Sequence, residues 1–213
     1  LLLTRPGTLQ LSYCEEKPVE EEETKAPPTS LIDGSIIYTG QTSWWTGKPQ
    51  GFGRMTFIET GDIYEGYFYD GKFYGKGTYV AQSGEKYVGD FKDGKRHGKG
   101  VVQYPNRTKY EGQFEDGRPH GKGIFTEEDG TIYEGEFKKG RRCGFGRSQS
   151  IDGSFYVGEW KYDKYHGKGK MTYKSGYIYE GEFRDGKKHG KGTLILPDGQ
   201  TISMEYEYDQ KMF

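Results

Sequence analysis

A repeat of fixed length runs through this chain of 213 residues. Its leading position recurs every 23 residues and holds glycine in six places and arginine in one: Gly61, Gly84, Arg107, Gly130, Gly153, Gly176 and Gly199. The first six head copies of the pattern Gly-x-x-Tyr-x-Gly-x-aromatic-x-x-Gly-x-x-x-Gly-x-Gly, with Asp163 as the one departure at the middle glycine. A period of this length predicts a stack of small supersecondary units and not one globular core.

Alternation within a copy predicts a hairpin. In the copy 61–83, residues 63–69 and 75–81 have strand character, and Asp70–Gly71 marks the turn between them. Tyr64, Gly66 and Phe68 then share one face, where a ring on one strand can cover the gap left by glycine on its neighbour. Glutamates and lysines lie on the other face, spaced for cross-strand pairing. We therefore predict an all-β fold, an elongated single-layer antiparallel ribbon of β-hairpin repeats.

The repeats divide the chain into three parts. Residues 1–33 carry seven Asp/Glu against three Lys/Arg, and this composition predicts an acidic, extended N-terminal tail. Residues 34–198 hold seven repeats, the first of them irregular, and residues 199–213 resemble a degenerate capping repeat. The predicted repeats are 34–60, 61–83, 84–106, 107–129, 130–152, 153–175 and 176–198.

Composition limits the classes of function. The net charge of −1 does not give the strong positive field of a nucleic-acid binder. Two cysteines are too few for a disulfide framework, which favours a reducing compartment. No apolar run reaches the roughly 18 to 20 residues of a membrane helix. The chain does not begin with Met, so we expect a processed or truncated N-terminus.

Several strings resemble a known family. YEGEF at 133–137 and 179–183, KRHGKG at 95–100 and KKHGKG at 187–192 are typical of the membrane occupation and recognition nexus (MORN) repeat. The resemblance implies an elongated sheet of hairpins and a scaffold or adaptor role without catalysis. Relatives occur in cilia and flagella, including radial-spoke heads, and in cytoskeletal structures.

Three kinds of chemistry are excluded by spacing. His97, His120, His166 and His189 occupy one repeat position, so neighbouring copies hold them about 9.6 Å apart, too far to share a metal ion. The Gly-x-Gly strings open strands and not helices, unlike a dinucleotide or phosphate loop. No Ser-His-Asp or Cys-His set is indicated. We therefore expect no catalytic residues, no metal and no cofactor.

Two sets of residues are candidates for binding. The partner-binding candidates are the two tryptophans of the irregular first copy, which could instead close the open end of the sheet, and six central rings: Trp44, Trp45, Tyr110, Phe114, Tyr133, Phe137, Tyr156 and Trp160. Tryptophan is favoured at binding hot spots, and the rings also have a structural role. The lipid-contact candidates are two basic clusters: Lys138, Lys139, Arg141, Arg142, Arg184, Lys187 and Lys188. They could contact anionic headgroups, although acidic residues lie among them.

The sequence favours a non-enzymatic scaffold subunit of a large assembly. The resemblance points to the ciliary axoneme, as in radial spokes, or to another cytoskeletal structure, with partner segments bound along an aromatic and glycine groove. One alternative is a peripheral membrane module that binds anionic phospholipids through its basic turns. Another is an accessory structural subunit of an organellar complex, such as a mitochondrial one.

Overall fold

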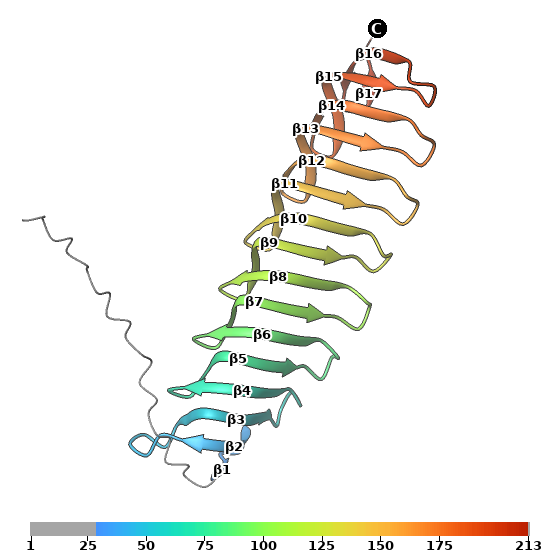
Figure 1. Cartoon of the computed structure of the whole chain (residues 1–213). Helices are drawn as coiled ribbons and strands as arrows, with labels where there is room; N and C mark the ends of the chain where they lie inside the picture. Colours follow the sequence, from blue (N-terminus) through green and yellow to red (C-terminus); the bar gives the residue numbers. More distant parts are fainter. Residues whose placement is uncertain (1–28, 213) are drawn as a thin grey trace, which may run out of the picture.

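The computed structural model describes residues 29–212. They form one 17-stranded sheet in which each strand pairs antiparallel with the next along the chain. Figure 1 shows the hairpins stacked into an elongated ribbon, with β1 at one end and β16 and β17 at the other. The predicted all-β ribbon of hairpin repeats is confirmed.

The strands follow the repeat. They are β1 (Thr29–Ile32), β2 (Ile36–Thr42), β3 (Pro49–Phe57), β4 (Ile63–Tyr69), β5 (Lys72–Val80), β6 (Lys86–Lys92), β7 (Lys95–Gln103), β8 (Lys109–Glu115), β9 (Arg118–Thr126), β10 (Ile132–Lys138), β11 (Arg141–Gln149), β12 (Phe155–Lys161), β13 (Lys164–Thr172), β14 (Ile178–Arg184), β15 (Lys187–Ile195), β16 (Thr201–Glu207) and β17 (Gln210–Lys211).

Two boundaries differ from those expected. The return strand β5 begins at Lys72, not at residue 75, because the turn before it needs only two residues. The predicted tail 1–33 lies mostly outside the described residues, but its last part, Thr29–Ile32, is strand β1 paired with β2. These four residues are extended, as expected, and they also join the sheet. A strand this short gives too little alternation to be recognised in a sequence.

The hairpin turns place both central residues in the left-handed region. Asp70 has φ 47° and Gly71 has φ 78°, as expected for a type I′ turn that suits the twist of antiparallel strands. The Gly71 N–H donates to the Pro49 carbonyl of the preceding hairpin at 2.9 Å. Equivalent bonds recur at the later turns, so each turn ties its hairpin to the one before.

A tyrosine lying over a pair of glycines forms the core of each repeat. Tyr110 is 1% exposed, and its hydroxyl donates to the Gln113 carbonyl at 2.8 Å. Gly112 and Gly123 face each other across the ladder beneath its ring. A Cβ on Gly123 would lie 2.5 Å from the Tyr110 hydroxyl oxygen, well inside contact distance. Only glycine therefore allows the ring to lie on the sheet.

A second row of rings joins the repeats into one column. Phe137 lies edge-on to Tyr133 of its own repeat at 5.2 Å and to Tyr110 of the preceding one at 4.9 Å between ring centroids. Such edge-to-face pairs stabilise beyond the area they bury. Each repeat contacts only its neighbours, so stability is a property of adjacent pairs, as in other repeat proteins.

Arg107 offers a direct test of the repeat's leading position. Its φ of 71° is close to the 73° of Gly61 and in the same left-handed region as the other glycines at this position, such as Gly84 at 89°. A left-handed conformation costs a non-glycine residue about 1–2 kcal/mol. We expect Arg107→Gly to raise the free energy of unfolding by about 0.5 kcal/mol, since the greater freedom of glycine in the unfolded chain offsets part of the gain. Denaturant unfolding measures the change, and an equal loss of stability would contradict it.

Candidate functional site: a groove on the polar face

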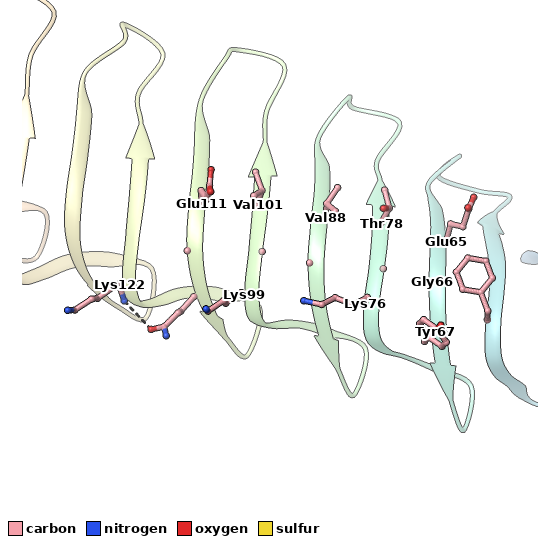
Figure 2. Close-up of a pocket in the computed structure, with 16 residues that line it drawn as sticks. Glu65, Gly66, Tyr67, Lys76, Thr78, Val88, Lys99, Val101, Glu111 and Lys122 are labelled. Atoms are coloured by element: carbon pink, nitrogen blue, oxygen red, sulfur yellow. Dashed lines mark hydrogen bonds between the residues drawn. The ribbon is translucent and has the colours of Figure 1, made fainter. Parts of the chain in front are cut away.

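A long groove runs along the face of the ribbon opposite the buried rings. The backbone of the paired glycines forms its floor, because the glycines face the rings while the residues that alternate with them project their side chains on this face. Figure 2 shows two rows of side chains rising on either side of the glycine Cα atoms. One row, which we call the lysine wall, includes Phe52, Tyr67, Lys76, Lys99, Gln113 and Lys122. The other, the valine wall, includes Glu65, Thr78, Val88, Val101, Glu111 and Ile124.

The groove continues through most of the repeats. Its first section, from Phe52 to Lys122, encloses about 730 Å³. A second section of about 550 Å³ shares Glu111 and Lys122 with the first. A third of about 360 Å³ shares Phe145 with the second and ends at Lys191. These shared residues show that the three sections adjoin one another across successive hairpins along the ribbon.

A β-bulge in every return strand shapes the lysine wall. The first glycine of each Gly-x-Gly pair adopts a positive φ, 60° at Gly121, and the ladder shifts register beside it. The bulge leaves a backbone N–H free, and Gln113 Oε1 accepts it from Lys122 at 3.1 Å. Asp90, Glu136 and Glu159 accept the corresponding N–H groups at 2.9–3.2 Å. The acidic and amide side chains of this wall therefore brace the bulges.

Because these carboxylates bind backbone N–H groups, this face has fewer Glu–Lys ion pairs than the sequence predicts. Cross-strand Glu–Lys pairs were predicted, but of the wall's lysines in the first section only Lys76 forms an ion pair in the described residues, to Asp90 at 2.6 Å. Partial burial acts to raise the pKa of Asp90, but the hydrogen bonds from Lys76 and from the Lys99 N–H outweigh it and lower that pKa. Lys99 faces the neutral Gln113. The N-terminal section of the lysine wall thus carries excess positive charge.

Exposed rings mark the N-terminal end of the groove. Phe52 and Tyr67 lie edge-to-face at 5.5 Å between centroids and are 51% and 50% exposed. Trp44 and Trp45 lie in the loop between β2 and β3, 4.0 Å apart between centroids. They are 81% and 78% exposed, so they are available to a partner. Their role in binding remains a prediction. Phe52 and Tyr67 were missed as candidates, although their alternation with the paired glycines already placed them on this face.

The six central rings proposed for partner binding lie elsewhere. Each is at most 5% exposed, because each packs against the glycine pairs and its neighbouring rings within the chain: Tyr110, Phe114, Tyr133, Phe137, Tyr156 and Trp160. The ring face is thus the core of the ribbon. These rings are buried by packing within the chain, and the groove lies on the opposite face. Sequence alternation separates the two faces but does not show which one is closed by its own packing.

The lipid-contact candidates fall into two groups, those held by contacts within the fold and those exposed to solvent. Arg142 is half-buried, with ion pairs to Glu127 at 2.7 Å and Asp163 at 3.6 Å, and lies over the Trp160 ring. Lys188 lies over three tyrosine rings at 5.2–5.3 Å, those of Tyr173, Tyr179 and Tyr206. These two cations are held by the fold. The others are exposed at the strand ends and turns: Lys138, Lys139, Arg141, Arg184 and Lys187. Lipid binding by this set remains a prediction.

The remaining candidates for chemistry are residues that could bind a metal or act as a nucleophile. Within residues 29–212, no group of three or more His, Cys, Asp and Glu side chains is placed to hold a metal ion. Cys143 is half-buried, and burial raises the pKa of its thiol, although Arg141 and Arg142 flank it in the sequence. The same part of the chain has no helix with the length and apolarity needed to cross a membrane.

The fold and the groove define a hairpin-repeat ribbon protein. The repeats match the description "MORN repeat" at residues 43–58, 64–86, 87–109, 110–132, 133–155, 156–176 and 179–201. The chain therefore belongs to the MORN repeat family. No curated protein sequence matches it.

Three solved structures show a distant likeness to this chain. The G-box domain of the microcephaly protein CPAP is 14% identical, covering 84% of this chain and 99% of that one, with a TM-score of 0.44. The TCP domain of SAS-4 from Drosophila melanogaster, solved with a proline-rich motif of Ana2, is 12% identical over 97% and 99%, with a TM-score of 0.39. The TCP10 domain of Danio rerio CPAP is 17% identical over 84% and 99%, with a TM-score of 0.26. At these values the likeness has no bearing on function.

Proposed function

We propose that this protein is a non-enzymatic scaffold subunit that holds an extended segment of another protein in the groove. The observation that carries the proposal is the continuity of the groove from Phe52 to Lys191. Its two walls repeat with each hairpin, so contacts add along the ribbon. A long, shallow channel of this kind suits a chain segment better than a small molecule, which buries most of its surface in a concave pocket.

The chemistry of the walls supports a segment with mixed character. Val88 is 46% exposed and Ile124 43%, so one wall offers apolar contact. The lysine wall offers cations and the exposed rings of Phe52 and Tyr67. We infer that the assembly is cytoskeletal, most directly a ciliary axoneme with radial-spoke-like subunits. The MORN family membership supports a scaffold, and the cytoplasmic, ciliary setting is our proposal from the family resemblance.

A photo-crosslinking experiment tests this function. A benzophenone amino acid replaces Val88 in the groove, with Ile151 as the matched control, since Ile151 is 79% exposed in the turn after β11 and away from the groove. In ciliated cells we expect Val88 to crosslink to axonemal or other cytoskeletal subunits and Ile151 not to.

A groove variant completes the test. Val88→Glu with Val101→Glu places two carboxylates on the valine wall, where both residues contact solvent. We expect at least tenfold weaker association, because an unpaired charge in a buried contact costs several kcal/mol. Unchanged association of the folded variant with the cytoskeletal fraction would rule out the groove as the binding site.

A further inference from the structure

We propose that residues 15–28 of this chain fold back along the lysine wall and occupy the N-terminal half of the groove. A partner would then have to displace this acidic segment. The proposal uses the groove of the proposed function but concerns the isolated chain, so either can fail without the other. Three observations select this occupant: the point where the chain enters the sheet, the order of its residues, and its length.

The entry point places the segment at the mouth of the groove. Thr29, the first residue of β1, pairs with Gly40, the floor glycine of the first repeat. The N-terminal end of β1 therefore lies on the side of Gln41. Gln41 belongs to the lysine wall, since its Oε1 lies against Gly51 as that of Gln113 lies against Gly121. The segment thus starts on the wall that it is proposed to follow.

The order of residues in the segment matches the order of chemistry along the groove. Reading back from Thr29, the chain presents Pro28 and Pro27 and then the acidic run 20–23, with Glu16 and Glu15 beyond. Going along the groove away from β1, the exposed rings of Phe52 and Tyr67 come first and the lysines follow. Proline-rich segments dock against aromatic surfaces. Carboxylates then meet ammonium groups.

The length of the segment also matches. Lys76, Lys99 and Lys122 lie on β5, β7 and β9, about 19, 29 and 38 Å from β1 at about 4.8 Å per strand. Glu23, Glu20 and Glu16 lie 6, 9 and 13 residues before Thr29, which gives about 19, 28 and 40 Å at the polyproline II rise of about 3.1 Å per residue. For each of these three lysines, one glutamate of the segment thus lies at about the same distance from β1.

Charge selects this half of the groove. Lys99 and Lys122 form no ion pair in the described part of the chain, and Asp90 is the only acidic residue between Lys76 and Lys122 on this wall. Lys122 faces Glu136, whose carboxylate is engaged by the Phe145 N–H. From β12 onward the wall alternates glutamate and lysine and is neutral: Glu159, Lys168, Glu182 and Lys191. Exposed ion pairs are weak singly and screened by salt, so the contact should depend on several pairs together.

Paramagnetic NMR on the full chain tests the proposal. The native Cys14 carries a nitroxide spin label, and Cys143→Ser removes the other thiol. At low salt we expect loss of the amide signals of groove residues on β9 to β11 and retention of those on β15. Uniform signals along the ribbon would overturn the proposal.

Two variants and a mixing control complete the test. Changing Glu20, Glu21, Glu22 and Glu23 to Gln should restore the lost signals. The double variant Lys99→Gln with Lys122→Gln should do the same, and so should about 1 M salt. Signal loss that survives these changes would refute the charge match. In the control, one sample of the chain carries the nitroxide but no NMR isotope, and a second carries the isotope but no nitroxide. Mixing the two should leave the amide signals intact. Loss in that mixture would assign the groove to a second copy and overturn the intramolecular contact.

Discussion

Gly123→Ala should destabilise the ribbon by about 3 kcal/mol, at the upper end of the range for overpacking a core. The added methyl would lie 2.5–2.7 Å from three atoms of the Tyr110 side chain. That ring cannot move away, because Phe114 and Phe137 lie edge-on to it at 5.0 and 4.9 Å between centroids. The ring must therefore leave the sheet or the ladder between β8 and β9 must open. Urea unfolding followed by circular dichroism measures the loss.

Gly117→Ala is the matched control for this substitution. Gly117 lies in the turn of the same hairpin with φ 82°, and a Cβ there meets nothing within 4 Å. Its cost is the strain of a left-handed alanine alone, about 1–2 kcal/mol. At Gly123, where φ is ordinary, the same change without a clash would stabilise by about 0.4–1 kcal/mol. A smaller loss at Gly123 than at Gly117 would show that the ring does not need the bare backbone.

The location of the damage is a second readout. Because each repeat contacts only its neighbours, a defect at β8 and β9 should divide the ribbon into two cooperative units. Hydrogen exchange should then quicken first in β7 to β10, while β4 and β14 keep their protection. Equal loss of protection throughout the described strands would mean that the ribbon unfolds as one unit.

The glycine pairs also explain how much of the fold could be predicted. The alternation of Tyr64, Gly66 and Phe68 fixes which side chains share a face, and the spacing to Gly77 fixes the hairpin. Both follow from periods of two along a strand. The bulge at Gly75 could not be predicted, since a Gly-x-Gly string fits a regular strand equally well. Its φ of 59° emerges only when the ladder is formed.

The candidate site was harder to predict than the fold. Alternation put Tyr133 and Trp160 on one face, but their burial comes from rings of adjacent repeats, which a single copy does not display. Arg142 seemed a free cation because its partners Glu127 and Asp163 lie 15 and 21 residues away. A groove was expected on the aromatic face, and its position on the polar face was not predicted for the same reason. Its walls are made by residues that share a repeat position, and they become neighbours only when the hairpins stack.

Alkaline pH should unfold this protein between about pH 10 and pH 11, through the tyrosines of its core. Seven of them are at most 1% exposed: Tyr38, Tyr64, Tyr87, Tyr110, Tyr133, Tyr156 and Tyr179. Burial raises the pKa of Tyr38, Tyr110 and Tyr179 to about 12 and raises that of the other four as well. In the unfolded chain these phenols ionise near pH 10.

The direction and size of the change in unfolding free energy follow from proton linkage. Below pH 10 both states keep their phenol protons, and the contribution to stability is fully present. Above pH 10 the unfolded chain loses protons that the folded chain retains, so stability falls as the pH rises towards 12. Each tyrosine lowers the free energy of unfolding by about 1.4 kcal/mol per pH unit in this range. Seven together remove about 10 kcal/mol by pH 11, comparable with the whole stability of a typical domain.

Phenolate absorbance of the buried tyrosines and the loss of strand signal in circular dichroism should appear together. The seven buried phenols should ionise only as the strands unfold. Tyr74→Phe is the matched control, because Tyr74 is 49% exposed and its loss should leave the unfolding midpoint unchanged. Tyr110→Phe removes one linked proton. Its free energy of unfolding should therefore fall less between pH 7 and pH 11 than that of the unchanged protein. Ionisation of all the tyrosines in one phase near pH 10, with the strands intact, would show that water reaches the rings on the glycine face.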